Sequence, residues 1–252
     1  MTLPHPRIAI LVVPCLALAG CATEPRPAAS PPTVAAPASP PAEPGPQHSH
    51  ASHAPHDHGA GMPHRFEHAD DWVKDFDDPG RDAWQRPDDV VAALGLRAGM
   101  TVADVGAGTG YFTVGLARAV PDGQIIATDL EPDMVRYLAE RAQREHLPNI
   151  RAVQAGADDP NLPPGSVDRI LVVDVWHHLG DRARYAAGLA AALRPGGQLA
   201  VVDFTAAATH GPPPAHRLAP AAIIADLEAA GLAARVSPTV LPQQYIVIAT
   251  RR

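Results

Sequence analysis

The chain has 252 residues, of which 46% are hydrophobic, 19% charged and only 4% aromatic, and its formal net charge is −7. It contains no block of Lys and Arg, and phosphate backbones require clustered cations, so the composition argues against a nucleic-acid partner. All eleven aromatic residues lie at or after Phe66, whereas 14 of the 29 prolines lie before Arg65. We therefore expect one folded domain from about residue 65, preceded by a non-globular leader.

The first 21 residues predict an export signal. His5 and Arg7 give a weakly cationic start, and residues 8–19 form an apolar run that is too short to span a bilayer. The sequence LAGC at 18–21 resembles the lipobox of bacterial lipoproteins, in which the cysteine is lipidated. The resemblance implies a cell-envelope protein attached through Cys21, on the periplasmic face of the outer membrane. The alternatives are an ordinary signal peptide, or an unused signal and a cytoplasmic protein.

Residues 22–64 predict a flexible tether, because they are rich in Pro, Ala and Ser and cannot bury enough apolar surface to offset the entropy of ordering. Seven histidines fall between His48 and His68, a composition that binds transition metals weakly or simply forms a polar spacer. We favour the spacer and expect no metal site. Cys15 and Cys21 are the only cysteines, so the folded domain has no thiol and no disulfide.

From residue 88 onward, apolar runs alternate with helical patterns. Five runs are nearly continuous in Val, Ile, Leu or Ala, as expected of strands covered on both faces: 101–105, 124–129, 150–154, 168–174 and 198–203. Apolar spacing of three and four predicts helices at 109–120, 132–146, 182–193 and 219–230. Two last runs, 233–237 and 244–250, predict an antiparallel hairpin. The pattern predicts an α/β domain with a doubly wound, mostly parallel, seven-stranded sheet.

Glycines and an acid follow the first two expected strands. In a doubly wound sheet, ligands bind beyond the carboxyl ends of the strands, where the strand order reverses. Gly106, Gly108 and Gly110 follow the first run and allow a tight turn and a close approach of the main chain to a ligand. Asp129 ends the second run, 19 residues after Gly110, and its carboxylate can accept two hydrogen bonds from a ribose diol.

Four motifs occur in order within residues 88–205: VADVGAGTGYF, IIATDLEPDMV, LPPGSVDRILVVDVWHHL and LRPGGQLAVVDF. Together they resemble the class I S-adenosylmethionine-dependent methyltransferases of the small-molecule type, the group with a methyltransferase type 11 domain. Residues 65–87 resemble the lead-in segment of exported bacterial members. The resemblance implies a Rossmann-like methyltransferase domain over residues 65–252, S-adenosylmethionine as the methyl donor and a small molecule as the acceptor.

The resemblance also implies which residues bind the methionine and ribose parts of the cofactor. Gly106, Gly108 and Gly110 match the positions that wrap the methionine and ribose. Asp104 matches the acid that supports the ammonium group. Asp129 matches the acid that holds the ribose hydroxyls, although an acid at this place can equally cap the following helix.

Three further positions match the adenine side and the floor of the site. Leu130 corresponds to a residue that lies against the adenine, and Asp158 to the acid that accepts from the adenine amino group. The chain departs from the family pattern here, because Ala157 stands where the acid is usual, and Asp159 is an alternative to Asp158. Asp174 corresponds to the floor beside the reactive methyl group, and the alternative is a buried structural acid.

His177 and His178 follow the fourth expected strand, where an acceptor would lie. Either is a candidate catalytic base, since histidine titrates near neutral pH. The alternative is that one histidine packs in the core and the other lines the rim, because methyl transfer relies largely on positioning and the exclusion of water.

The lead-in segment also leaves two interpretations open. Residues 84–86 can form part of a lid over the cofactor. Equally, Trp72, Phe76 and Trp84 can be apolar anchors that pin the segment to the core.

Two other functions fit parts of the sequence. A dinucleotide-binding oxidoreductase has a small residue at the third position of G-x-G-x-x-G, where this chain has Tyr111, so NAD is the weaker alternative. A catalytically inactive binding module on the envelope would remove the difficulty that S-adenosylmethionine is made in the cytosol. The identity of the acceptor is not indicated by any motif.

Overall fold

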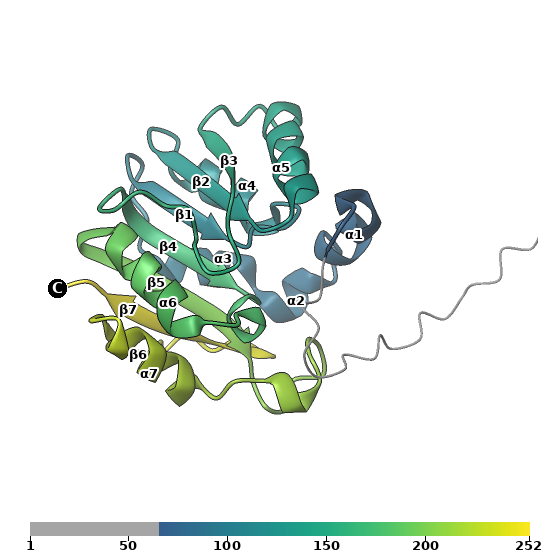
Figure 1. Ribbon diagram of the computed structural model, residues 1–252. Coiled ribbons are helices and arrows are strands. Elements are labelled where there is room, and N and C mark those ends of the chain that lie inside the picture. Colours follow the sequence, from purple (N-terminus) through teal and green to yellow (C-terminus); the bar gives the residue numbers. More distant parts are fainter. Residues whose placement is uncertain (1–65) are drawn as a thin grey trace, which may run out of the picture. The chain divides into compact units, whose positions relative to one another are not determined.

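The computed structural model describes residues 66–252, and the expected signal peptide, tether and most of the histidine tract lie outside the described residues. The described domain is built on a seven-stranded sheet with the order β3-β2-β1-β4-β5-β7-β6 (Figure 1). The strands are β1 (Thr101–Val105), β2 (Gln124–Asp129), β3 (Ile150–Gln154), β4 (Val167–Val173), β5 (Leu193–Phe204), β6 (Ala233–Val236) and β7 (Gln244–Thr250). The predicted α/β fold is confirmed.

Strands β1 to β5 are parallel, and β7 runs antiparallel between β5 and β6. The predicted C-terminal hairpin is therefore confirmed. The order reverses between β1 and β4, since the chain moves outward from β1 through β2 to β3 and then returns to the other side of β1. This reversal places a ligand-binding crevice beyond the carboxyl ends of β1 and β4.

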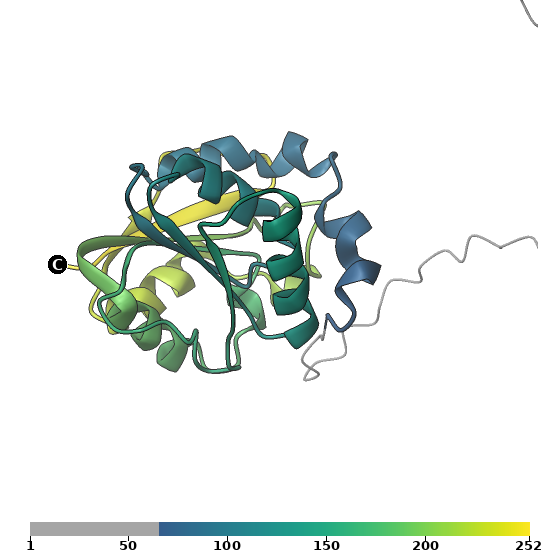
Figure 2. The same cartoon turned by 90° about the horizontal axis from the view of Figure 1, so that it is seen from above.

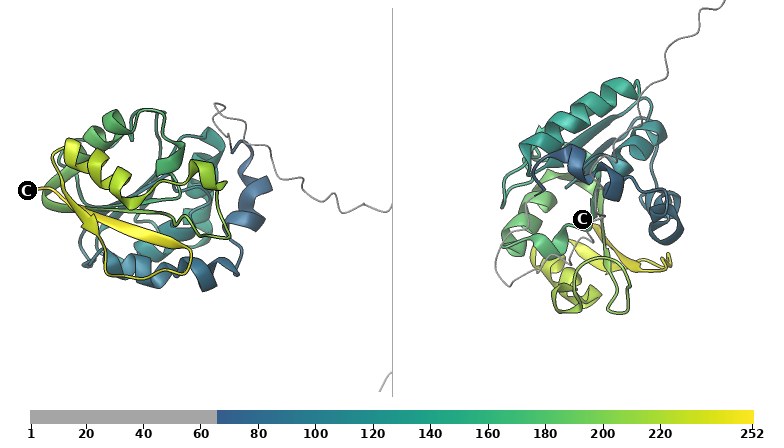
Figure 3. Two further views of the ribbon diagram at one scale, coloured as in Figure 1. Left: turned by 90° about the horizontal axis from the view of Figure 1, so that it is seen from below. Right: turned by 90° about the vertical axis from the view of Figure 1, so that its right-hand side faces the viewer.

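Two helical layers cover the sheet. Helices α3 (Pro87–Ala93), α4 (Tyr111–Ala119) and α5 (Pro132–Arg144) pack on one face, and α6 (Arg182–Ala192) and α7 (Pro220–Ala229) pack on the other (Figures 2 and 3). Leu116 and Ile223 are fully buried representatives of the two layers. Within residues 66–252, no helix is both long and apolar enough to cross a membrane.

The central strands bury side chains on both faces, which explains their nearly continuous apolar sequence. Strand β5 is longer than the predicted 198–203, because Leu193 pairs with Val167 and so extends the ladder across the Pro-Gly-Gly turn. Strand β4 begins and ends one residue earlier than predicted, so Asp174 lies just beyond it. The backbone N–H of Asp174 still donates to the Val202 carbonyl of β5 at 3.0 Å, so this bond holds Asp174 at the edge of the sheet.

The lead-in segment forms α1 (Ala69–Phe76), α2 (Arg81–Gln85) and α3. Helices α1 and α2 lie across the carboxyl edge of the sheet (Figure 1), and the backbone amide of Ala69 donates to Asp133 Oδ2 at 2.7 Å. Pro87 opens α3 directly after Arg86, whose φ of 50° turns the chain between α2 and α3. The fold thereby brings residues 66–86 over the ends of the strands.

The α6 layer provides a test of the core. Leu189 is fully buried in that layer, so we expect Leu189→Ala to lower the free energy of unfolding by about 2–5 kcal/mol. Val240→Ala is the control, because Val240 is 80% exposed and its truncation is expected to change stability by less than about 0.5 kcal/mol. Urea denaturation monitored by circular dichroism measures both, and equal effects would contradict the packing described here.

Candidate active site at the carboxyl edge of the sheet

The glycine loop after β1 adopts the tight turn that the sequence predicts. Gly106, Gly108 and Gly110 have φ values of 71°, 55° and 95°, a region that side chains rarely adopt. A Cβ atom on Gly106 would lie 2.3 Å from Val175 Cγ2, and one on Gly108 would lie 3.2 Å from the Phe76 ring. The backbone is thus bare on the side that faces β4 and the lead-in segment.

Asp129 connects the end of β2 to this loop. Its Oδ2 accepts from the backbone N–H of Gly108 at 2.8 Å, and its Oδ1 accepts from the N–H of Glu131 at 3.0 Å. Burial raises the pKa of Asp129, while these two backbone N–H groups oppose that shift. Each carboxylate oxygen keeps a second lone pair, so Asp129 can still accept two hydroxyl hydrogens. Leu130 beside it is 46% exposed.

Asp104 lies beneath the loop on β1. It is buried and accepts a hydrogen bond from Thr113 Oγ1 at 2.6 Å. Burial, together with the negative charge of Asp129, raises the pKa of Asp104 to about 7, although the hydrogen bond from Thr113 acts in the opposite direction. A cationic group placed beside Asp104 would favour the ionised carboxylate.

The acids after β3 occupy different environments. The Asp158 carboxylate is half-exposed and lies 3.8 Å from Arg184. Asp159 Oδ1 accepts from the backbone N–H of Asn161 at 2.8 Å and so closes its own turn. Asp158 therefore keeps more hydrogen-bonding capacity for a ligand than Asp159 does.

Asp174 forms the centre of a polar cluster after β4. It has a φ of 59°, a strained conformation that Asp tolerates better than most residues. Gln85 Nε2 donates to Asp174 Oδ2 at 3.0 Å, Gln244 Nε2 donates to Oδ1, and Arg81 lies 3.9 Å away. Burial raises the pKa of Asp174 to about 6, although the charge of Arg81 lowers it. The strain and the convergence of three elements mark this residue as part of a built site.

The structure distinguishes the two histidines that the sequence grouped together. His177 is buried, and its Nδ1 lies 2.9 Å from Oδ1 of Asp203, whose side chain is fully buried at the end of β5. The His178 ring lies 4.2 Å from that of His177 and 6.0 Å from Phe66, on the side of the lead-in segment. Sequence reasoning missed Asp203 as a site residue, although it ends a strand as Asp129 does.

The lead-in segment closes over the glycine loop. Asp77 accepts two hydrogen bonds from Arg141 Nη1 of α5, at 2.9 and 2.8 Å, and one from Thr109 Oγ1 at 3.0 Å. Phe76 packs against Trp72 at a ring-centroid distance of 5.7 Å and faces Gly108. Residues 66–86, which we term the lid segment, are thus both anchored to the domain and placed where a cofactor would be covered.

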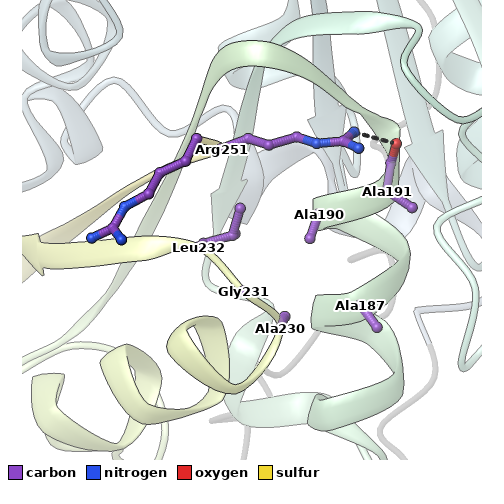
Figure 4. A pocket seen from close by; sticks show the side chains of 8 residues that line it. Ala187, Ala190, Ala191, Ala230, Gly231, Leu232 and Arg251 are labelled. Atoms are coloured by element: carbon purple, nitrogen blue, oxygen red, sulfur yellow. Dashed lines mark hydrogen bonds between the residues drawn. The ribbon is translucent and has the colours of Figure 1, made fainter.

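Two surface grooves lie on the described domain, one of them away from this crevice and the other beside it. One of about 350 Å³ runs between α6, α7 and the end of β7, where Arg251 Nη1 donates to the Ala191 carbonyl at 3.0 Å (Figure 4). A second, of about 330 Å³, lies between the lid segment and the start of α5. Among residues 66–252, no group of three or more His, Cys, Asp or Glu side chains is arranged to hold a metal ion.

The central region of the chain is similar to known methyltransferases. Residues 102–197 match the family described as "Methyltransferase domain". The ubiquinone/menaquinone biosynthesis C-methyltransferase UbiE of Marinomonas sp. (strain MWYL1) is 31% identical over 124 residues, which are 48% of this chain and 49% of the relative. An uncharacterized methyltransferase of Mycobacterium tuberculosis (strain ATCC 25618 / H37Rv), Rv3342, is 36% identical over 116 residues, 46% of this chain and 44% of its own length. The chain spans about half the length of these curated relatives.

Solved structures extend the likeness to almost the whole described domain. A SAM-dependent methyltransferase from Aquifex aeolicus superposes with a TM-score of 0.66 at 29% identity, covering 72% of this chain and 98% of that one. The [4+2]-cyclase SpnF, at 17% identity and a TM-score of 0.56, covers 66% of this chain and 80% of that one and shares the fold alone. The domain has the Rossmann-like class I methyltransferase fold, and its central region is similar in sequence to methyltransferase domains.

Asp104 predicts a pH dependence of stability. Its pKa is higher in the folded protein than in the unfolded chain, so between about pH 4 and 7 the folded state binds more protons. The stabilising proton is fully present below pH 4 and lost as the pH rises through 7, so the free energy of unfolding falls across this window. We expect a loss of about 2–4 kcal/mol from this group.

Asp104→Asn tests this origin, because the amide oxygen can still accept from Thr113 but does not ionise. Urea denaturation at pH 4, 5.5 and 7 is expected to show a shallower decline for the variant than for the wild type. Asp174 also makes the free energy of unfolding fall as the pH rises, by a smaller amount, and this contribution is present in both the wild type and Asp104→Asn. Parallel pH curves would contradict the assignment to Asp104.

Proposed function

We propose that the protein is an S-adenosylmethionine-dependent methyltransferase that acts on a small-molecule acceptor. The single observation that carries the proposal is the bond between Asp129 and the main chain of Gly108, which builds a bare backbone turn beside an acid at the topological switch point. The match of residues 102–197 to a methyltransferase domain and the solved neighbours imply the methyl donor. The acceptor is not indicated by either.

The residues present fit the cofactor. Gly106, Gly108 and Gly110 allow the tight turn, because all three have positive φ and a Cβ atom on any of them would crowd a neighbouring side chain. The neighbour of Gly108 is the Phe76 ring of the lid segment, so the main chain at Gly108 would be open to a ligand once that ring moves. Asp129 would accept from the ribose hydroxyls through its remaining lone pairs. Asp104 would become ionised beside the ammonium group.

The adenine side and the lid complete the proposed site. Leu130 would lie against the adenine, and Asp158, rather than Asp159, would accept from its amino group. Asp174 would form the floor, held in place by Gln85 and Gln244. Because Phe76 now lies over Gly108, the lid segment has to move by at least the thickness of a ring for the cofactor to enter.

The cofactor, when bound, supplies a methyl group on a sulfonium, which is an electrophile ready for in-line displacement. The protein's contribution is to bind and orient it at the end of β1 and β2 and to hold the acceptor in line beyond β4. The lid segment excludes water from the site through its aromatic side chains and the contact of Asp77 with Arg141.

A binding module that has lost catalysis is the main alternative, because the fold alone does not specify a reaction. Binding of a dinucleotide such as NAD is less well supported. Tyr111 stands where a dinucleotide fingerprint needs a small residue, and its hydroxyl donates to Asp82 of the lid segment while Arg81 lies 4.3 Å from its ring. Tyr111 is thus part of the lid contact.

We also propose that the chain is exported and attached to the envelope through Cys21. The support is the apolar run and the LAGC sequence at 18–21. Labelling cells with palmitate, followed by membrane fractionation, tests this point for the wild type and Cys21→Ala. Label that persists in the variant, or a wild-type protein found wholly in the cytosol, would contradict the proposal.

Calorimetric titration with S-adenosylmethionine, S-adenosylhomocysteine and NAD tests the main proposal. We expect both sulfur nucleosides to bind with one site per chain and NAD to show no heat. Binding of NAD alone would replace the proposal with an oxidoreductase, and binding of none of them would support a non-cofactor module.

Asp129→Ala is expected to weaken the binding of S-adenosylhomocysteine by about 1–3 kcal/mol, because it removes a charged acceptor from the ribose site. Calorimetry measures the loss. Asp122→Ala serves as the control, since Asp122 is exposed in the turn before β2 and is expected to bind like the wild type. Wild-type affinity of Asp129→Ala would remove the ribose assignment.

Asp77→Asn is expected to loosen the lid segment, because the amide loses the charge-assisted contact with Arg141. We expect amide hydrogen exchange in residues 69–85 to rise about tenfold, equivalent to about 1.4 kcal/mol, and S-adenosylhomocysteine to dissociate faster. Glu140→Gln is the control, since Glu140 pairs with Arg136 on the exposed side of the same helix. Unchanged exchange in Asp77→Asn would show that the contact does not hold the lid.

A further inference from the structure

We infer that His177 is the general base of the reaction, that Asp203 is its positioning residue, and that the acceptor is a neutral hydroxylated aromatic compound. The inference rests on the proposed function, since it assigns the acceptor half of the same site. It is carried by the buried contact between His177 and Asp203 and by the groups that surround it.

The contact with Asp203 fixes which ring nitrogen of His177 is the base. Asp203 Oδ1 lies 2.9 Å from His177 Nδ1 and also accepts from the backbone N–H of Phe204 at 2.8 Å. An ionised carboxylate only accepts hydrogen bonds, so Nδ1 has to carry the hydrogen. The lone pair of a neutral His177 is then on Nε2.

The burial of the pair gives it a fixed geometry. The side chain of His177 is 4% exposed and that of Asp203 is fully buried, at the ends of adjacent strands β4 and β5. Trp176, which is fully buried, donates from Nε1 to Asp226 Oδ2 at 3.0 Å and so anchors the turn that carries His177. The His178 ring lies toward the lid segment, 6.0 Å from the Phe66 ring.

Charges around His177 come from three elements besides its own turn. Asp203 lies on β5, Asp174 follows β4, and Arg81 belongs to α2, with His178 adjacent on the same turn. The charge of Asp203 raises the pKa of Asp174 and that of His177 lowers it. Such a site repels an acceptor that carries a carboxylate or phosphate, and we therefore expect a neutral acceptor.

A buried oxygen beside His177 points to an acceptor that donates a hydrogen bond. Within residues 66–252, Oδ2 of Asp203, the residue that contacts His177, is buried without a hydrogen-bond partner. An ionised carboxylate oxygen only accepts, so the missing partner is a donor. A hydroxyl group supplies one, whereas an ether or a thioether does not.

Aromatic side chains adjoin the same side of the site. The Phe204 ring lies 6.3 Å from His177 and 5.9 Å from Trp84, and Trp84 stacks on His210 at 4.9 Å with an interplanar angle of 14°. Trp84 directly precedes Gln85, which contacts Asp174. A planar ring beside His177 would lie close to the Phe204 ring, and aromatic contacts add to the burial of apolar area.

A phenolic hydroxyl also matches the strength of the base. A phenol has a pKa of about 10, so an imidazole can accept its proton as the new bond forms, whereas an alkyl alcohol is a far weaker acid. In the step, the proton moves from the acceptor oxygen to His177 Nε2 as the oxygen–carbon bond forms, the sulfur–carbon bond breaks, and its electron pair goes to sulfur. The imidazolium, stabilised by Asp203, then releases the proton to solvent.

The first test reads the histidine without turnover. Nitrogen-15 NMR of histidine-labelled protein with S-adenosylhomocysteine, assigned with His177→Gln, is expected to show the tautomer protonated on Nδ1. Asp203→Asn is expected to lose that preference, because the amide can also donate. A wild-type His177 protonated on Nε2, or an unchanged tautomer in Asp203→Asn, would overturn the positioning role.

The second test uses a matched acceptor panel with methyl-labelled S-adenosylmethionine: a catechol, its dimethyl ether, the corresponding aniline and the corresponding benzoate. We expect label on the catechol alone. Transfer only to the amine or the benzoate, or no transfer although calorimetry shows the cofactor bound, would overturn the acceptor class. Absence of cofactor binding would instead contradict the proposed function.

A third test measures the single-turnover rate of methyl transfer to the catechol as a function of pH. In the wild type we expect the rate to fall at acidic pH. In His177→Gln we expect a rate that is at least 100-fold lower and does not change with pH. In Asp203→Asn we expect a rate about 10- to 100-fold lower whose acidic fall occurs at lower pH. His216→Gln is the control, since His216 is exposed on the loop after β5. A His177→Gln profile that keeps the acidic limb would show that another group is the base.

Discussion

The carboxylate of Asp129 connects two parts of the molecule that come from different strands. It accepts from the main chain of Gly108 with one oxygen and from that of Glu131 with the other, so the loop after β1 and the start of α5 share one anchor. This arrangement requires a loop without side chains, because Gly106 and Gly108 have positive φ and close neighbours. The proposed cofactor site, the lid that covers it and the acceptor side beyond β4 all depend on the position of that loop.

The fold was largely predictable from the sequence because its signals are local. Continuous apolar runs gave the buried strands, and the final pair of runs without a helix between them gave the antiparallel hairpin. The ends of the strands were less predictable. Strand β5 extends through a Pro-Gly-Gly turn because Leu193 finds a partner in Val167, a contact that is far away in sequence.

The glycine loop and the position of Asp129 followed from the same local reasoning, but the acceptor side did not. Asp203 looked like the end of an apolar strand, and only the pairing of β4 with β5 brings it to His177. Gln85 and Gln244, which hold Asp174, are separated from it by 89 and 70 residues. Polar side chains with such distant partners carry no periodicity, so sequence alone does not identify them.

The crevice therefore has two halves with different chemistry. The half at β1 and β2 presents main chain and one acid to the proposed nucleoside, and the half at β4 and β5 presents a buried carboxylate oxygen, a histidine and an aromatic ring. The lid segment spans both, since Phe76 faces Gly108 and Gln85 contacts Asp174. One movement of this segment would open both halves together, which suits a reaction that has to exclude water from two ligands.

The most direct test of the central claim is a crystal structure of the protein with S-adenosylhomocysteine. The account predicts the ribose hydroxyls within hydrogen-bonding distance of Asp129, the methionine part against residues 106–110, and Phe76 displaced from Gly108. A nucleoside bound elsewhere, or a glycine loop still covered by Phe76 at saturating ligand, would contradict it.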